Sequence, residues 1–110
     1  MKPIMWEGEH SKVIIIVPDD FVRKESDSFS FLVVNAFCEN DFGPNVMYYF
    51  DDGWSIHTWI NGSQKHCTTG PASIIFDPNG KIDSKKYHIH GGELTETEFK
   101  EMQENISILK

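Results

Sequence analysis

Short apolar runs separated by turn residues dominate this chain and predict a mainly β fold. Val13–Val17 is a continuous apolar run that ends at Pro18, a pattern typical of a buried strand. Phe29–Phe37 is longer and also apolar, and it predicts a central strand. Further strands are predicted at Val46–Phe50, Ser55–Ile60, Ser73–Phe76 and Lys85–His90.

The pattern changes near residue 94, where apolar side chains begin to recur at helical spacing. Thr95 and Glu98 have the spacing of a capping box, and Leu94 and Phe99 that of a hydrophobic staple. A helix is therefore expected over about residues 96–108. Its apolar face would pack on the sheet or cap an open end of it, and presentation of the helix to a partner is the alternative. That face consists of Phe99, Met102, Ile106 and Leu109.

Residues 43–92 contain one pattern twice. Gly43-Pro44 and Gly70-Pro71 lie 27 residues apart, as do the turn residues Gly53 and Gly80. Asp-Gly and Asn-Gly favour tight hairpin turns, because Gly and Asn tolerate positive φ. Each copy is therefore predicted to form one hairpin, and the copies are predicted to stack.

Together these patterns predict an α+β domain that is mainly β. We expect an antiparallel meander of about six strands from two imperfect repeats, with one C-terminal helix. A chain of 110 residues is long enough for a single core. The predicted organisation is a single domain with N-terminal strands in residues 1–40, two hairpin repeats in 43–92 and the helix in 95–110.

The repeat region resembles a known family. The residues that carry the resemblance are Trp59-Ile60-Asn61-Gly62, His66, Gly70-Pro71-Ala72, Asn79-Gly80, Tyr87, Gly91 and Phe99. They are similar to MORN-like repeats, in the Gly-Pro-Ala variant of small bacteriophage and bacterial antitoxin-like proteins. The first copy departs from this pattern, because Asn45 replaces the alanine and Glu39 stands in place of the histidine. The resemblance implies stacked antiparallel hairpins and a role in binding, and it carries no catalytic residues.

The composition is that of an acidic globular protein. Hydrophobic residues make up 39% of the chain, and the formal net charge is −7. Such a surface repels phosphate backbones, so direct nucleic-acid binding is not expected. No apolar run is long enough for a signal core or a membrane span. Two cysteines, Cys38 and Cys67, favour reduced thiols and a cytoplasmic location, in the host cytoplasm if the gene belongs to a phage.

Histidines are the candidate metal ligands. His88 and His90 are two residues apart on a predicted strand and would share a face. The spacing matches no zinc motif, so solvent-facing histidines near a turn are the favoured interpretation. We expect neither a metal nor another cofactor. A third zinc ligand would come from His66, Cys67 or Asp83.

No catalytic constellation is recognisable, and the protein is expected not to be an enzyme. His66 and Cys67 are adjacent, so on a strand they point to opposite faces and cannot form a dyad. His66 is expected instead to brace the Gly70-Pro71 turn. The carboxylates that could be imagined as a pair occupy turns, where Asp makes local hydrogen bonds. They are Asp51, Asp52 and Asp77.

The hairpin over residues 46–60 carries large side chains on both faces. Alternation places Tyr48 with Phe50 on one face and Met47 with Tyr49 on the other. One face must fill the core, where Trp59 is expected. The other is either covered too or forms a binding patch, because exposed Tyr and Trp are typical of interfaces. The predicted partner-binding residues are Trp54, Tyr49, Asp51, Asp52 and His57.

These observations predict a small non-catalytic acidic protein that engages and inhibits or masks a macromolecular partner. A host protein or a toxin-like protein is the expected partner, and phage anti-defence is the most concrete form of this hypothesis. Membrane binding is not expected, and homo-oligomerisation stays open. The alternative is a protein that sequesters a nucleotide-like signal, and a metal-dependent hydrolase ranks third. The ligand-binding residues of the alternative are Lys81, Lys85, Lys86 and Tyr87.

Overall fold

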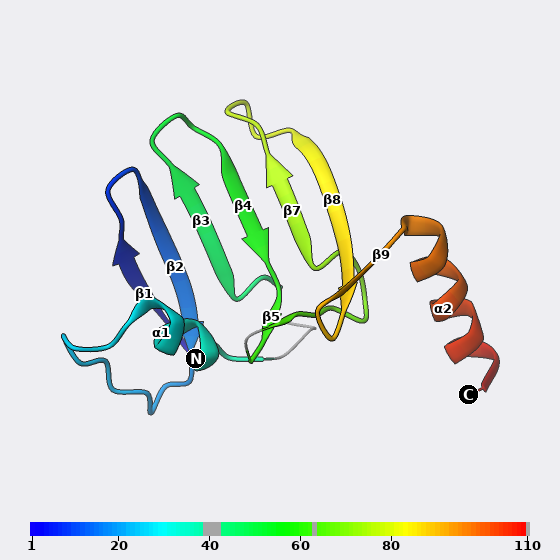
Figure 1. Cartoon of the computed structure of the whole chain (residues 1–110), viewed down its shortest axis with the longest axis horizontal. Coiled ribbons are helices and arrows are strands. Elements are labelled where there is room, and N and C mark those ends of the chain that lie inside the picture. Colours follow the sequence, from blue (N-terminus) through cyan, green and yellow to red (C-terminus); the bar gives the residue numbers. More distant parts are fainter. Residues whose placement is uncertain (39–42, 63, 110) are drawn as a thin grey trace.

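A computed structural model describes residues 1–38, 43–62 and 64–109, with side chains in the last helix as far as Glu104. The fold is mainly β, as the sequence predicts. Seven strands form one antiparallel sheet in the order β1-β2-β3-β4-β7-β8-β9, and β5 and β6 form a separate pair (Figure 1). The elements are β1 (Lys2–Glu7), β2 (Ser11–Val17), α1 (Phe29–Val34), β3 (Val46–Phe50), β4 (Ser55–Thr58), β5 (Ile60–Asn61), β6 (Gln64–Lys65), β7 (Ser73–Phe76), β8 (Ile82–Ile89), β9 (Gly92–Leu94) and α2 (Glu96–Leu109).

The main sheet differs from the predicted six-strand meander in three elements. β1 and β9 are strands that the sequence analysis did not predict. The predicted central strand at Phe29–Phe37 is wrong, because this segment contains the helix α1. A short apolar run fits a buried helix as well as a strand. The local signal for a helix was Ser28, whose hydroxyl caps α1 by accepting the N–H of Phe31 at 3.1 Å.

The predicted return strand Ser55–Ile60 is divided, because β4 ends at Thr58 and Ile60 begins β5. The buried side chain of Asn45 explains the break. Its Oδ1 accepts the N–H of Ile60 at 2.8 Å, and its Nδ2 donates to the carbonyl of Ile60 at 2.6 Å. Ile60 lies opposite Lys65 of β6, and the amide side chain of Asn45 bonds both backbone groups of Ile60 as a strand neighbour would.

Three hairpins, β1–β2, β3–β4 and β7–β8, stand side by side with their turns at the same end of the sheet, uppermost in Figure 1. The longer connections run at the opposite end, through α1 and through the β5–β6 pair. The predicted first strands Val46–Phe50 and Ser73–Phe76 are confirmed, and the predicted strand Lys85–His90 corresponds to part of β8.

The core lies on one face of the N-terminal half of the sheet, which we name the covered face. Leu32 of α1 is fully buried there, and the Phe29 ring lies 5.6 Å from Trp6 and 6.3 Å from Tyr48 between ring centroids. Burial of this face is the main stabilising contribution of α1. The strand residues of the covered face are Ile4, Trp6, Val13, Ile15, Val17, Val46 and Tyr48.

The predicted C-terminal helix is confirmed as α2, and so is its capping box. The Thr95 N–H donates to Glu98 Oε1 at 3.0 Å, and the Glu98 N–H donates to Thr95 Oγ1 at 3.1 Å. Phe99 is buried, with its ring centroid 4.8 Å from that of Tyr87 in β8. The helix therefore packs at the β8–β9 edge of the sheet. The side chains of Ile106 and Leu109, from the predicted apolar face, lie outside the described side chains.

Replacement of Gly80 tests the hairpin turns. Gly80 has φ of +83°, and the space around its Cβ position is open, so backbone strain is the only penalty. We expect Gly80→Val to cost about 1–3 kcal/mol of unfolding free energy. Thermal unfolding would measure it as a Tm decrease of roughly 4–8 °C per kcal/mol.

The matched control is Gly70→Ala, since Gly70 lacks a positive φ and has open space around its Cβ position. Gly70 recurs in the repeat, but neither its φ nor its surroundings require a glycine. The control is expected to keep its Tm within about 1 °C, the range of a surface substitution. Equal Tm values for both variants would contradict the assignment of the turn.

Candidate functional site

The face of the sheet opposite α1 carries a row of apolar side chains, and we name it the open face. Ile14, Met47, His57 and Ile74 lie directly opposite one another across β2, β3, β4 and β7. Met5 extends the row at one end and remains 45% exposed. Among the described residues, α1 packs on the other face and α2 contacts β8 and β9, so neither helix covers this row.

Three rings lie together on the open face. His57 lies between Tyr49 and Phe76, with centroid distances of 6.0 Å to Tyr49 and 4.8 Å to Phe76. Burial lowers the pKa of His57, so the imidazole is neutral near pH 7. Tyr49 is 39% exposed. The rings therefore form an uncharged aromatic surface that is accessible to another molecule.

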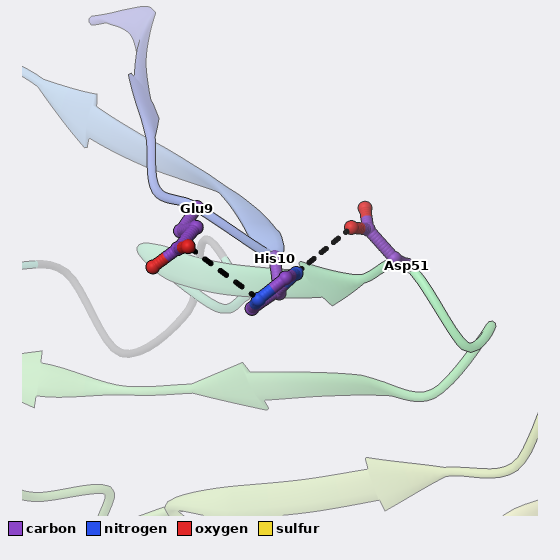
Figure 2. Close-up of polar contacts among 3 residues, drawn as sticks. All are labelled: Glu9, His10 and Asp51. Atoms are coloured by element: carbon purple, nitrogen blue, oxygen red, sulfur yellow. Dashed lines mark ion pairs between the residues drawn. The ribbon is translucent and has the colours of Figure 1, made fainter.

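The turns beside this face are acidic. Figure 2 shows His10, in the β1–β2 turn, between two carboxylates: Glu9 at 3.9 Å and Asp51 of the β3–β4 turn at 3.7 Å. The N–H of Asp51 also donates to the carbonyl of His10 at 3.0 Å. These groups are exposed to solvent, so the ion pairs contribute little to stability. Their effect is to place negative charge at one end of the open face.

The structure brings together some of the predicted partner-binding residues and separates others. Tyr49 and His57 lie in contact on the open face, and Asp51 is in the adjacent turn. Asp52 accepts the N–H of Trp54 at 3.2 Å, the local turn bond expected for an aspartate at this position. Trp54 is half-buried and directly precedes β4, where alternation places it on the side opposite His57.

The open face also contains residues that the sequence analysis did not select. Phe76 and Ile74 come from β7, and Ile14 and Met5 come from the N-terminal hairpin. Their alternation with polar or covered-face residues could be seen in the sequence. The order of the strands in the sheet could not, because it depends on pairing between residues that are far apart in the chain.

The residues of the ligand-binding alternative lie partly together. Lys85, Lys86 and Tyr87 line a groove of about 580 Å³ between β8, β9 and the start of α2. Lys81 lies in the β7–β8 turn, where its N–H donates to Asp77 Oδ1 at 3.0 Å. Four carboxylates line the same groove, from Asp83, Glu93, Glu96 and Glu98. This excess of negative charge disfavours a phosphate-bearing ligand.

His66 braces the β8–β9 turn rather than the Gly70-Pro71 turn expected from the sequence. Its Nδ1 accepts the N–H of His90 at 2.9 Å, and the two rings stack with centroids 4.4 Å apart. His90 has φ of +48° in this tight turn. His88 is also buried, and its Nδ1 has no hydrogen-bond partner in the part of the chain that the structure describes.

These histidines are not arranged as a metal site. His90 follows the end of β8, so it does not alternate with His88 as expected, and the Nδ1 of His66 is already occupied by a backbone N–H. Across residues 1–38, 43–62 and 64–109, no three His, Cys, Asp or Glu side chains are placed to hold a metal ion. Cys38 and Cys67 are both free thiols.

Comparisons with known proteins give no family: no protein-family model, curated protein or solved structure matches this chain significantly. Among the described helices, none is long and apolar enough to cross a membrane.

The buried histidines predict a pH dependence of stability. Burial, with the His90 ring second, lowers the pKa of His66, and burial also lowers the pKa of His88. The unfolded chain therefore takes up protons more readily than the folded protein below about pH 6.5. The free energy of unfolding should decrease as the pH falls from 7.5 to 5, as measured by urea denaturation.

The variant His66→Asn isolates one part of this effect. An asparagine side-chain oxygen can accept the His90 N–H but does not titrate in this range. We expect the decrease in unfolding free energy between pH 7.5 and 5 to be smaller in the variant. An unchanged pH dependence would show that His66 does not contribute.

Proposed function

We propose that this protein is a non-catalytic binding protein that engages a protein partner through the open face and so inhibits or masks it. The observation that carries this proposal is the row of side chains across the sheet, apolar except for the neutral His57, together with the rings of Tyr49 and Phe76 on either side of His57. Contiguous apolar surface of this kind marks interaction sites, because it costs free energy when it is left in water.

The chemistry of the surface indicates the kind of partner. Tyr49, His57 and Phe76 are uncharged and nearly rigid, and such side chains supply large contact area at a small entropic cost. Acidic turns border one end of the face, and the whole chain has a formal net charge of −7. A partner with an apolar patch and a basic border would complement both features.

The nucleotide-like alternative has less support. A groove does gather Lys85, Lys86 and Tyr87, but four carboxylates outnumber the two ammonium groups in its lining. Tyr87 is engaged by Phe99 at 4.8 Å between centroids, so one side of its ring is already occupied. A protein partner therefore ranks above a phosphate-bearing ligand.

Two equivalent hydrogen bonds support the proposed origin from two repeats. The N–H of Asn45 donates to Thr58 of its own hairpin at 3.0 Å, and the N–H of Ala72 donates to Lys86 of its own hairpin at 2.9 Å. Asn45 and Ala72 both follow a Gly-Pro pair.

Under this proposal a phage-type role against a host protein is the most specific form of the function.

Photo-crosslinking tests whether the open face binds a partner. A photoreactive phenylalanine analogue would replace Tyr49 in one protein and Val22 in another, since Val22 is 75% exposed and lies in the loop between β2 and α1, outside the row of the open face. In cells of the native host, the Tyr49 position is expected to give a discrete adduct that the Val22 position does not. Mass spectrometry of the adduct would identify the partner.

Substitution then measures the contribution of the face. We expect Tyr49→Ala to keep its Tm and to weaken partner binding by about 2 kcal/mol, as for a central interface aromatic. Val22→Ala is the matched control and should bind normally. Identical adducts from both photoreactive positions, or full affinity in Tyr49→Ala, would contradict the proposal.

A further inference from the structure

More than half of β8, residues 82–86, lacks a strand neighbour on its outer side among the described residues. β7 pairs with β8 from Ile82 to Lys86, whereas β9 pairs only with residues 87–89. Within the described residues, no strand therefore lies beside 82–86 on the side away from β7. This is a stretch of sheet edge with backbone groups available for pairing.

Backbone geometry identifies a group that faces outward. The carbonyl of Lys86 accepts the N–H of Ala72, on the side of β7. Backbone groups alternate in direction along an antiparallel strand, so the N–H and C=O of Lys85 face away from the sheet. A bulge between Ile75 and Phe76 disturbs the pairing only beyond Ser84.

The opposite edge of the sheet, at β1, is protected in ways that β8 is not. Pro3 offers no N–H, and the Arg23 guanidinium donates to the carbonyl of Met5. The amino group of Met1 is paired with Asp19 at 2.7 Å. An incoming strand would therefore find free backbone groups at β8 rather than at β1.

A groove is already present along this part of β8. β9 stops at Leu94 because the Thr95–Glu98 capping box turns the chain into α2. The space in which β9 would have continued is the groove of about 580 Å³. Five strand residues span roughly 17 Å, so the groove has room for an extended peptide segment of about five residues.

The lining of the groove selects the charge of its occupant. Four carboxylates face two ammonium groups, and Glu98 is held ionised by its bonds to Thr95, which lower its pKa. Exposed Ile82 and half-buried Leu94 supply apolar contacts at the two ends. An extended segment with alternating basic and β-branched residues complements this surface.

We infer that the outer edge of β8 is a strand-addition site that binds an extended basic segment of a partner protein, between Lys85 and the start of α2. Backbone hydrogen bonds to Lys85 would supply affinity, and the carboxylates of Glu93 and Glu96 would select for basic side chains. Lys85 lies directly opposite Ile74 of the open face, so this site borders that face at β8, but backbone pairing at the strand edge does not depend on the function proposed above.

The probe is the capped pentapeptide acetyl-Lys-Val-Lys-Val-Lys-amide, titrated into the full chain and followed by NMR. We expect the peptide to change the amide chemical shifts of residues 82–86 and to slow hydrogen exchange at the Lys85 N–H. An otherwise identical peptide that is N-methylated at all five residues has no residue N–H left to donate to β8 and should not bind. The acidic peptide acetyl-Glu-Val-Glu-Val-Glu-amide should not bind either.

Variants of the protein separate backbone pairing from charge. Lys85→Pro removes an outward N–H without touching the β7 ladder, so it should fold and lose peptide binding, whereas Lys85→Ala should retain it. The double variant Glu93→Gln/Glu96→Gln should weaken the peptide Kd roughly three- to ten-fold. Tyr49→Ala should leave peptide binding unchanged.

Several results would overturn the inference. The inference would be wrong if millimolar lysine-containing peptide caused no change in the amide chemical shifts of residues 82–86. Equal binding of the N-methylated peptide, or full binding by a folded Lys85→Pro variant, would also overturn it, because binding would then not involve the strand edge. Loss of peptide binding in Tyr49→Ala would place the peptide on the open face instead.

Discussion

Asn45 makes the hydrogen bonds on which the arrangement of this protein depends. Its backbone joins β2 to β4, through the N–H of Ile16 and the carbonyl of Thr58. Its side chain holds both backbone groups of Ile60 and also the carbonyl of Phe37, just after α1. Because Asn45 is buried, loss of any of these bonds would leave polar groups unsatisfied in the interior. One residue thereby fixes where the central strands end and where α1 returns to the sheet.

The two faces of the sheet acquire different roles as a consequence. Held at this end, α1 places Leu32 and Phe29 over β1, β2 and β3, and the main cluster of buried hydrophobic side chains forms on that side. On the other side, neither of the described helices lies over the row and its rings. A chain of this size can cover one face with a six-residue helix, so the second face is available for a partner.

Local signals in the sequence predicted local structure well. The hairpin turns, the strands β3 and β7 and the capping box of α2 each depend on residues close together in the chain. α1 was missed because Phe29–Phe37 fits both periodicities, and the division at Thr58 was missed because it depends on Asn45, fifteen residues before Ile60. Tyr49 and His57 were selected from alternation, whereas Phe76 became their neighbour only through the pairing of β4 with β7.

Hydroxyl-radical footprinting of the isolated protein would show whether one face of the sheet is covered and the other open. We expect rapid oxidation of Met5 and Tyr49 on the open face and slow modification of Leu32 and Val17 in the core, after correction for intrinsic reactivity. Partner binding should then protect Met5 and Tyr49 together. Strong protection of both residues in the monomeric protein without a partner would show instead that the open face is already covered.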